Sequence, residues 1–231
     1  MPDTFANPAI RTVLFDLDGT LVDSAPDLHV AANKVLCENS RRDVSLDEIT
    51  MMIGDGVPKL VERCFEATGD GMYGDDLATL AKRFLEVYEP HAADLTVAFP
   101  GALDCLTRLK SQGYALALCT NKPYDATMEI LGALGLDDAL DVVIGGDTLP
   151  GIKKPDPRHL LAALEKLGKE PASAVMVGDN ANDVNSAKAA GLPAIVCRFG
   201  YNQGPAENLG GDLIIEHFDE LPEAFKELPS A

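Results

Sequence analysis

The sequence predicts an α/β fold: a doubly wound, Rossmann-like parallel sheet forms the core and carries an inserted all-helical cap domain. Two observations lead to this prediction. Short apolar runs alternate with helical patterns along most of the chain, which is typical of parallel strands joined by helical crossovers. Between about residues 24 and 99, however, helical patterns follow one another without a strand. We therefore expect an α/β core of residues 1–23 and 100–231 and a cap domain of residues 24–99.

Six apolar runs predict the strands of the sheet. Each run is short, is continuously apolar and ends at a polar residue or a glycine, as expected for strands that are buried on both faces. The runs are Val13–Phe15, Ala115–Cys119, Val142–Ile144, Ala174–Val177, Ala194–Cys197 and Leu213–Ile215.

Helical periodicity fills most of the intervals between these strands. It covers residues 102–110, the region around residues 124–131, and residues 158–167. The last of these helices has clear ends, because Asp156 suits its N-cap and Gly168 suits its C-terminal stop.

The inserted segment contains four helical signals. Apolar stripes cover residues 28–36, 57–67 and 77–88, and a capping box at Ser45 and Glu48 starts another helix. The segment leaves the core at residues 23–26 and returns at residues 98–101. Two neighbouring linkers of this kind would let the insert open and close as a lid.

Composition and charge restrict the class of partner. Hydrophobic residues make up 46% of the chain, which is ordinary for a globular protein, and no apolar run is long enough to span a membrane. The formal net charge is −18, which disfavours nucleic acid and anionic membranes as partners. An anionic substrate would need local positive charge at its site.

The cysteines and the first residues indicate a compartment. The five cysteines are scattered and odd in number, so we expect free thiols in a reducing cytoplasm. The first twelve residues lack the basic and apolar regions of a secretory signal. We therefore expect a cytoplasmic protein.

Polar residues follow several of the predicted strands. In a parallel sheet the carboxyl ends of the strands meet at one edge, where ligands bind. The residues that converge there are Asp16 and Asp18 after the first strand, Thr120 and Asn121 after the second, Lys154 in the loop after the third, and Asp179 and Asp183 after the fourth.

These residue types together indicate phosphoryl transfer. Clustered carboxylates repel one another unless a cation joins them, and hard oxygen ligands suit Mg²⁺. Lys154 can neutralise some of the remaining charge and hold a carboxylate still. The Thr120 hydroxyl and the backbone N–H of Asn121 lie near a helix start, which can hold phosphate oxygens.

Four motifs, in order, resemble the signatures of the haloacid dehalogenase superfamily: "DLDGT" at residues 16–20, "TNK" at 120–122, "KKPDP" at 153–157 and "VGDNANDV" at 177–184. The helical insert is similar to the cap that this superfamily places between its first two motifs. Further stretches, including "LVDSAPDL" and "FGYNQG", resemble bacterial phosphoglycolate phosphatases.

The resemblance implies a role for each motif residue. Asp16 would be the nucleophile that forms an aspartyl-phosphate, and Asp18 the general acid and then the general base. Gly19 and Thr20 would allow a sharp turn and hold Asp18. Thr120 and Asn121 would bind the transferring phosphoryl group, and Lys154 would stabilise its charge and orient Asp16.

The same resemblance implies a metal site. Mg²⁺ would be held by the side chain of Asp16, the backbone carbonyl of Asp18 and the side chain of Asp179. Asp183 would be a further ligand or a neighbour of the ligands; as an acid near a helix start, it could instead complement the helix dipole. The loop around Gly54 and Gly56 would face the substrate.

These roles imply a Mg²⁺-dependent phosphatase for a small phosphate monoester, most simply 2-phosphoglycolate. Another small phosphate such as a sugar phosphate, or a mutase reaction, stays open. A phospho-aspartate signalling switch is disfavoured by the insert and by the acid at Asp18. The expected partner is the small-molecule substrate, and the protein would be a monomer or a homodimer.

Overall fold

A computed structural model describes residues 10–228 of the chain. The parts of the predicted core at residues 1–9 and 229–231, including most of the segment searched for a secretory signal, lie outside the described residues. Within the described residues no helix is long and apolar enough to cross a membrane.

A six-stranded parallel sheet forms the core, in the spatial order β5-β4-β1-β6-β7-β8. Every predicted strand is present, with a one-residue extension of the first and the fourth. Their bounds are β1 Thr12–Phe15, β4 Ala115–Cys119, β5 Val142–Ile144, β6 Ala174–Gly178, β7 Ala194–Cys197 and β8 Leu213–Ile215.

Helices cover both faces of this sheet, as continuously apolar strands require. Val13 and Phe15 belong to one hydrophobic cluster and Leu14 to the other, since successive strand residues face opposite sides. Helices α5, α6 and α9 contribute to the first cluster, and α7 and α8 to the second. Their bounds are α5 Ala102–Ser111, α6 Tyr124–Leu134, α7 Pro157–Leu167, α8 Ala181–Ala190 and α9 Leu221–Glu227.

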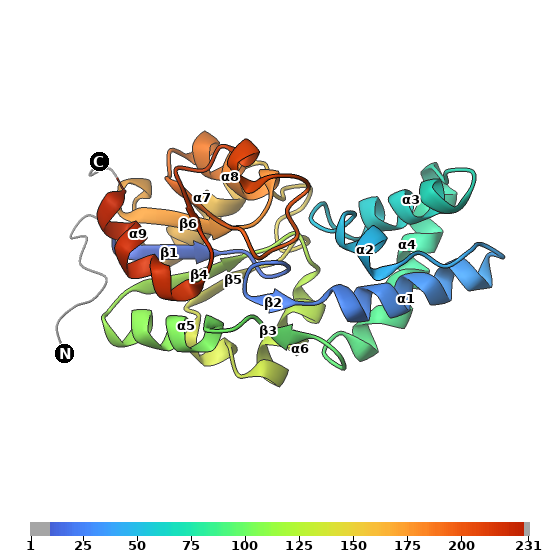
Figure 1. Ribbon diagram of the computed structural model, residues 1–231, viewed down its shortest axis with the longest axis horizontal. Helices are drawn as coiled ribbons and strands as arrows, with labels where there is room; N and C mark the ends of the chain where they lie inside the picture. The colour runs from blue at the N-terminus through green and yellow to red at the C-terminus, as the bar shows by residue number, and fades with distance from the viewer. Residues whose placement is uncertain (1–9, 229–231) are drawn as a thin grey trace.

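The insert is a separate group of helices beside the core, joined to it through two short strands (Figure 1). Its helices are α1 Ala25–Glu38, α2 Leu46–Thr50, α3 Val57–Thr68 and α4 Gly74–Tyr88, with a 3₁₀ turn η1 at Glu89–His91. Further 3₁₀ turns in the core are η2 Asp137–Ala139, η3 Pro171–Ser173, η4 Ala206–Leu209 and η5 Phe218–Glu220.

The expectation of a strand-free insert was wrong at its end. Strand β3, Val97–Ala98, lies within the segment and pairs antiparallel with β2, Val22–Asp23. The outgoing and returning linkers therefore satisfy each other's backbone groups. Two residues are too short a stretch to show an alternating pattern, so this pair of strands could not be predicted from the sequence.

The helix caps that the sequence predicts are present in the structure. The Ser45 side chain accepts the Glu48 N–H and the Glu48 side chain accepts the Ser45 N–H, which completes the predicted capping box. Asp156 accepts the N–H of Arg158 at the start of α7, and Gly168 ends that helix in the left-handed conformation. Such caps depend on neighbours in sequence, so they can be predicted without the tertiary structure.

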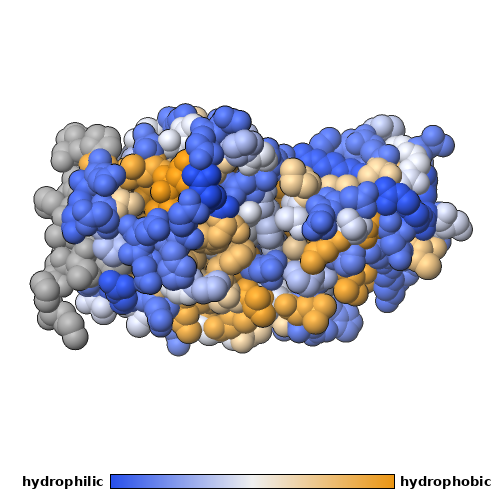
Figure 2. Space-filling view, viewed as in Figure 1, coloured by the Kyte–Doolittle hydropathy of each residue, from blue (hydrophilic) through white to orange (hydrophobic). Residues whose placement is uncertain are grey.

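The surface is mostly hydrophilic, and its outline narrows where the core meets the insert (Figure 2). The formal net charge of −18 means that an acidic cluster at the site needs its own local cation. The central strand β1 lies between β4 and β6, where the crossovers turn to opposite sides. This switch point is where an open α/β sheet forms its ligand crevice.

Candidate active site

Asp16 lies directly after β1 and is buried. Its Oδ1 accepts a hydrogen bond from the Leu17 N–H at 2.7 Å and pairs with Lys154 Nζ at 2.8 Å. Burial, and then the charge of Asp183, raise the Asp16 pKa to about 7, although Lys154 opposes the shift. Lys154 therefore fixes the direction of the Asp16 carboxylate, but its charge does not cancel the effect of burial and of Asp183 on the Asp16 pKa.

Three buried carboxylates come together around this point. Ligand atoms of Asp16, Asp179 and Asp183 all lie within 4.8 Å of one another. Burial and the charges of Asp183 and Asp16 raise the pKa of Asp179 well above its ordinary value. The sequence predicts that these acids meet at one edge of the sheet, and in the structure their carboxylate oxygens lie close together.

Asp183 contacts three neighbours through its two carboxylate oxygens. Its Oδ1 pairs with Lys154 Nζ at 2.6 Å, and its Oδ2 accepts the backbone N–H groups of Asp179 and Asn180. It is therefore the N3 member of the capping box that starts α8, in agreement with its predicted place near a helix start. Its role toward a metal ion stays a prediction.

Gly19 makes the turn that the sequence predicts. Its φ of +81° lies in the left-handed region, and a Cβ at this position would come within 2.3 Å of Asp179 Oδ2. A larger residue would therefore strain the turn and displace a carboxylate of the cluster.

Thr20 was expected to hold Asp18, but its hydroxyl contacts a different carboxylate. Its hydroxyl donates to Asp179 Oδ1 at 3.0 Å, and the Tyr201 N–H donates to Asp179 Oδ2 at 2.7 Å. The turn at Gly19 brings Thr20 back against β6 rather than along β1. Thr20 consequently orients a carboxylate of the cluster.

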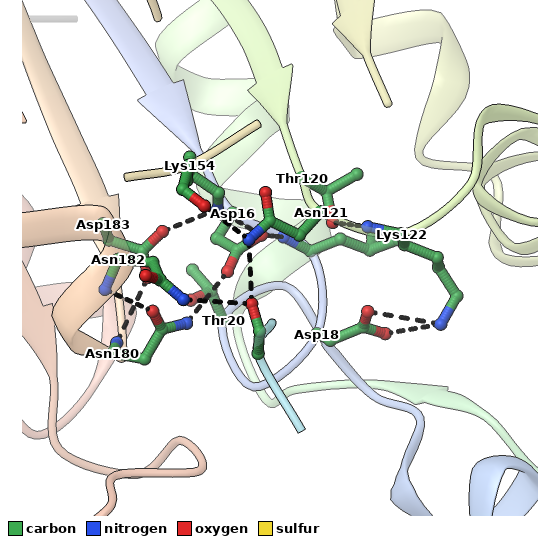
Figure 3. Close-up of polar contacts among 12 residues, drawn as sticks. Asp16, Asp18, Thr20, Thr120, Asn121, Lys122, Lys154, Asn180, Asn182 and Asp183 are labelled. Carbon is green, nitrogen blue, oxygen red and sulfur yellow. Dashed lines mark hydrogen bonds and ion pairs between the residues drawn. The ribbon is translucent and has the colours of Figure 1, made fainter. Parts of the chain in front are cut away.

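Asp18 points away from the other acids, as Figure 3 shows. Lys122 Nζ contacts its two oxygens at 2.9 and 3.2 Å, and the Ser24 hydroxyl donates to Oδ1. The Lys122 ammonium also lies 4.8 Å from the centre of the Tyr88 ring, which belongs to α4 of the insert.

The sequence reasoning missed Lys122 as a functional residue. The available signal was its place in "TNK", directly after Thr120 and Asn121 at the carboxyl end of β4. Nothing in the sequence marked Tyr88 as more than an apolar member of a helix face. Its contact with Lys122 depends on how the insert sits on the core.

Thr120 and Asn121 lie where predicted, at the end of β4. The Thr120 hydroxyl oxygen accepts the Lys122 N–H at 3.1 Å. The Asn121 side-chain amide donates to Gly54 O at 2.9 Å and to Lys154 O at 3.0 Å, while its buried Oδ1 has no hydrogen-bond partner among residues 10–228. Asn121 thus joins the core to the insert through its side chain, beyond the backbone role expected of it.

A small cavity of about 30 Å³ lies between core and insert. Its core side is polar and its insert side is mainly apolar. The core contributes Asp16, Asp18, Thr120, Asn121 and Lys122, and the insert contributes Leu28, Ile53, Gly54, Gly56, Val57 and Leu60. The insert loop around Gly54 therefore faces the same space as the acids, as the sequence predicts.

Several core side chains hold this loop in place. Lys153 Nζ donates to Asp55 O at 2.6 Å, and Asn182 donates to Asp55 Oδ1 at 2.8 Å. Arg63 of α3 pairs with Asp55 Oδ2 at 2.6 Å from the insert side. The loop is thus closed over the acids by contacts from both parts.

The residues present fit a divalent cation. Three buried carboxylates face one ammonium, that of Lys154, so ionising all three would leave two negative charges uncompensated. Burial, and then the neighbouring acids, raise the pKa values of Asp16 and Asp179, so their joint ionisation is costly without a further cation. An all-oxygen, acidic donor set suits a hard metal ion.

Residues 10–191 match the family model of haloacid dehalogenase-like hydrolases. The chain belongs to this hydrolase family. The haloacid dehalogenase-like hydrolases similar to it include a phosphoglycolate phosphatase of Caulobacter vibrioides, 41% identical over 92% of this chain and 90% of the relative. Another is a phosphoglycolate phosphatase of Cereibacter sphaeroides, 44% identical over 94% of this chain and 98% of the relative.

Solved structures of the family agree with this fold. A crystal structure described as a predicted phosphoglycolate phosphatase from Haemophilus somnus is 30% identical, with a TM-score of 0.86 over 93% of this chain and 97% of that one. CbbY from Rhodobacter sphaeroides, solved in complex with phosphate, is 26% identical with a TM-score of 0.78, over 92% of this chain and 96% of that one. The sheet with its helical insert is therefore the fold of this hydrolase family.

Proposed function

We propose that this chain hydrolyses 2-phosphoglycolate to glycolate and phosphate through an aspartyl-phosphate on Asp16. The observation that carries the proposal is the buried Asp16, held by Lys154 and lining a small cavity between core and insert. The names of relatives at 41% and 44% identity, aligned over most of both chains, support the choice of substrate.

In the first step, the Asp16 carboxylate attacks phosphorus and the bond to the glycolate oxygen breaks. Lys154 and the Leu17 N–H fix the direction of the carboxylate. Thr120 and Asn121 line the space beside Asp16, where their polar groups can meet the phosphoryl oxygens. Asp18, in its protonated form, gives its proton to the departing alkoxide.

In the second step, Asp18 accepts a proton from the water that attacks the aspartyl-phosphate. Phosphate leaves and the Asp16 carboxylate is regenerated. The contacts of Asp18 with Ser24 and Lys122 hold it on the cavity wall, apart from the acid cluster, so that the two carboxylates can perform different tasks. The closed loop around Gly54 limits the entry of water.

We propose Mg²⁺ as the cation, held by the side chains of Asp16 and Asp179 and the backbone carbonyl of Asp18, with Asp183 beside them. When bound, such an ion polarises a phosphoryl oxygen and offsets developing negative charge. The oxygen-only donor set and its uncompensated charge support this choice.

We also propose that residues 24–99 move as a lid over a core of residues 1–23 and 100–231. A cavity of about 30 Å³ is too small to hold a phosphate ester while the loop around Gly54 stays against the core. The insert must therefore swing away for substrate to enter and for product to leave.

A phosphatase assay over a panel of small phosphate esters, with Mg²⁺ and with EDTA, tests the proposal. We expect a preference for 2-phosphoglycolate, loss of activity in EDTA, and a loss of at least about 10³-fold in Asp16→Asn. The matched control is Asp75→Asn, an exposed acid of α4, which should keep full activity. Substantial metal-dependent activity in Asp16→Asn would refute the nucleophile, and a preference for sugar phosphates would refute the substrate.

A further inference from the structure

The cavity contains one cationic side chain. Among the residues that line it in the described part of the chain, Lys122 alone carries a positive charge. The basic residues of the nearby insert are engaged elsewhere: Arg63 pairs with Asp55 and donates to Met52 O, and Lys59 pairs with Glu62. Apart from the phosphoryl site, Lys122 is therefore the cation that an anionic group in this cavity would contact.

Lys122 is buried and paired with an acid. Its side chain is 3% exposed, and its ammonium lies 2.9 Å from Asp18 Oδ1. The ammonium has three N–H donors, and Asp18 accounts for contacts through one carboxylate only. A second acceptor can therefore join the same ammonium.

The surroundings of Lys122 can accommodate a negative group. The buried Tyr88 side chain lies beside the ammonium, with its ring centre 4.8 Å away. Across the cavity, α3 begins at Gly56 and Val57 without a side-chain cap and without an acid in its first turn. Lys122 and this helix start favour a negative group between them.

We propose that Lys122 determines substrate specificity by pairing with a second anionic group on the alcohol part of the substrate, beyond its contact with Asp18. The substrate class is a small phosphate ester with a carboxylate close to the ester oxygen. This inference rests on the proposed phosphatase function, in which that group is the carboxylate of 2-phosphoglycolate.

The position explains how the two ends of such a substrate are told apart. The phosphoryl end meets Asp16 and Lys154, whose ammonium is occupied by two carboxylates of the cluster. The carboxylate end meets Lys122, which pairs with Asp18 and not with the acid cluster (Figure 3). Because Lys122 touches Asp18, this pairing also brings the ester oxygen toward the proposed proton donor.

Two substrates of similar size test the inference: 2-phosphoglycolate and 2-hydroxyethyl phosphate, in which a neutral hydroxymethyl group replaces the carboxylate. In Lys122→Met we expect kcat/KM for 2-phosphoglycolate to fall about 10–100-fold further than for 2-hydroxyethyl phosphate, mainly through KM. Lys122→Arg keeps the charge and should restore part of the preference. The control Lys59→Met removes an exposed cation of the insert and should leave the ratio unchanged.

The outcomes separate this inference from the proposed function. An equal loss on both substrates in Lys122→Met would mean that the lysine serves Asp18 alone, and would overturn the inference while the phosphatase function stands. A wild-type enzyme without activity on 2-phosphoglycolate would overturn both. Activity on 2-hydroxyethyl phosphate that survives in Lys122→Met also reports that the variant is folded.

Discussion

At the scale of single residues, the defining feature is a buried carboxylate cluster that one lysine only partly balances. Asp16 and Asp179 both have raised pKa values, chiefly because they are buried and then because of neighbouring acids. Lys154 pairs with Asp16 and Asp183. Burial alone would favour the neutral lysine, but these two acids raise its pKa above the ordinary value. The cluster can therefore accept a further cation, and its ionised carboxylates repel one another when that cation is absent.

The pH dependence of metal binding follows from these shifts. The folded chain without metal keeps a proton on Asp16 up to about pH 7, whereas an unfolded chain releases it near 3.8. The protonated Asp16 carboxyl therefore stabilises the folded chain fully below its unfolded pKa of 3.8. This contribution is lost as the pH rises through its folded pKa of about 7. A metal ion that needs the ionised carboxylates should then stabilise most at high pH.

We expect saturating Mg²⁺ to raise the melting temperature more at about pH 8 than at about pH 5.5, relative to EDTA, as measured by differential scanning fluorimetry. Asp179→Asn should lose most of the increment at both values. Equal increments at the two pH values in the wild type would show that Asp16 and Asp179 do not control metal binding.

Asp18 offers a second prediction at this scale. Asp18→Asn keeps the backbone carbonyl proposed as a ligand but removes the proton carrier, so turnover should fall about 10²–10⁴-fold. Metal affinity, measured by isothermal titration calorimetry, should change little. A large loss of affinity with turnover intact would reverse the assignment of Asp18.

At the scale of elements, the loop between α2 and α3 connects the insert to the site. Asn121, Lys153 and Asn182 reach it from three separate segments of the core. Arg63 supports it from within the insert by donating to Met52 O and pairing with Asp55. The sequence indicated a loop at its two glycines, but the residues that hold it closed come from distant positions.

Removing one of these contacts should weaken closure without harming the fold. Asn182 lies in the first turn of α8, where alanine is a good helix former, and donates to Gly54 O and Asp55 Oδ1. In Asn182→Ala we expect KM to rise about fivefold, in line with about 1 kcal/mol for a hydrogen bond. The melting temperature should change little.

Lys188→Ala, on the last turn of the same helix, is the matched control and should leave KM unchanged. Hydrogen exchange of residues 53–57 provides the direct readout, because a looser loop exchanges faster. Unchanged KM and exchange in Asn182→Ala would mean that this contact does not hold the loop.

At the scale of the whole molecule, the junction of core and insert is tied at both linkers. The buried Asp27 carboxylate of α1 accepts the N–H groups of Leu95 and Thr96 and the Thr96 hydroxyl. Nearby, the Tyr201 hydroxyl donates to Asp23 and accepts the Ala25 N–H. Since the outgoing and returning chains are joined to each other, the proposed lid has one hinge rather than two loose linkers.

Asp27 should therefore matter for stability more than an exposed acid does. Asp27→Ala leaves several buried donors without an acceptor, and we expect the free energy of unfolding to fall by about 3 kcal/mol in urea denaturation. Asp27→Asn retains one acceptor oxygen and should lose less. Asp94→Ala, which removes an exposed partner of His91, should cost less than about 0.5 kcal/mol; similar losses in both alanine variants would exclude the hinge role of Asp27.

The strands, the main helices and the sheet edge at which the acids and Lys154 meet could all be predicted from the sequence. Apolar runs, caps and turns depend on near neighbours, and a parallel sheet brings the ends of its strands to one side. Three features could be seen only in the folded molecule: Thr20 holds Asp179, Lys122 joins Asp18 to Tyr88, and β2 pairs with β3. These contacts join residues far apart in the chain, and their existence depends on side-chain direction and on how the insert lies against the core.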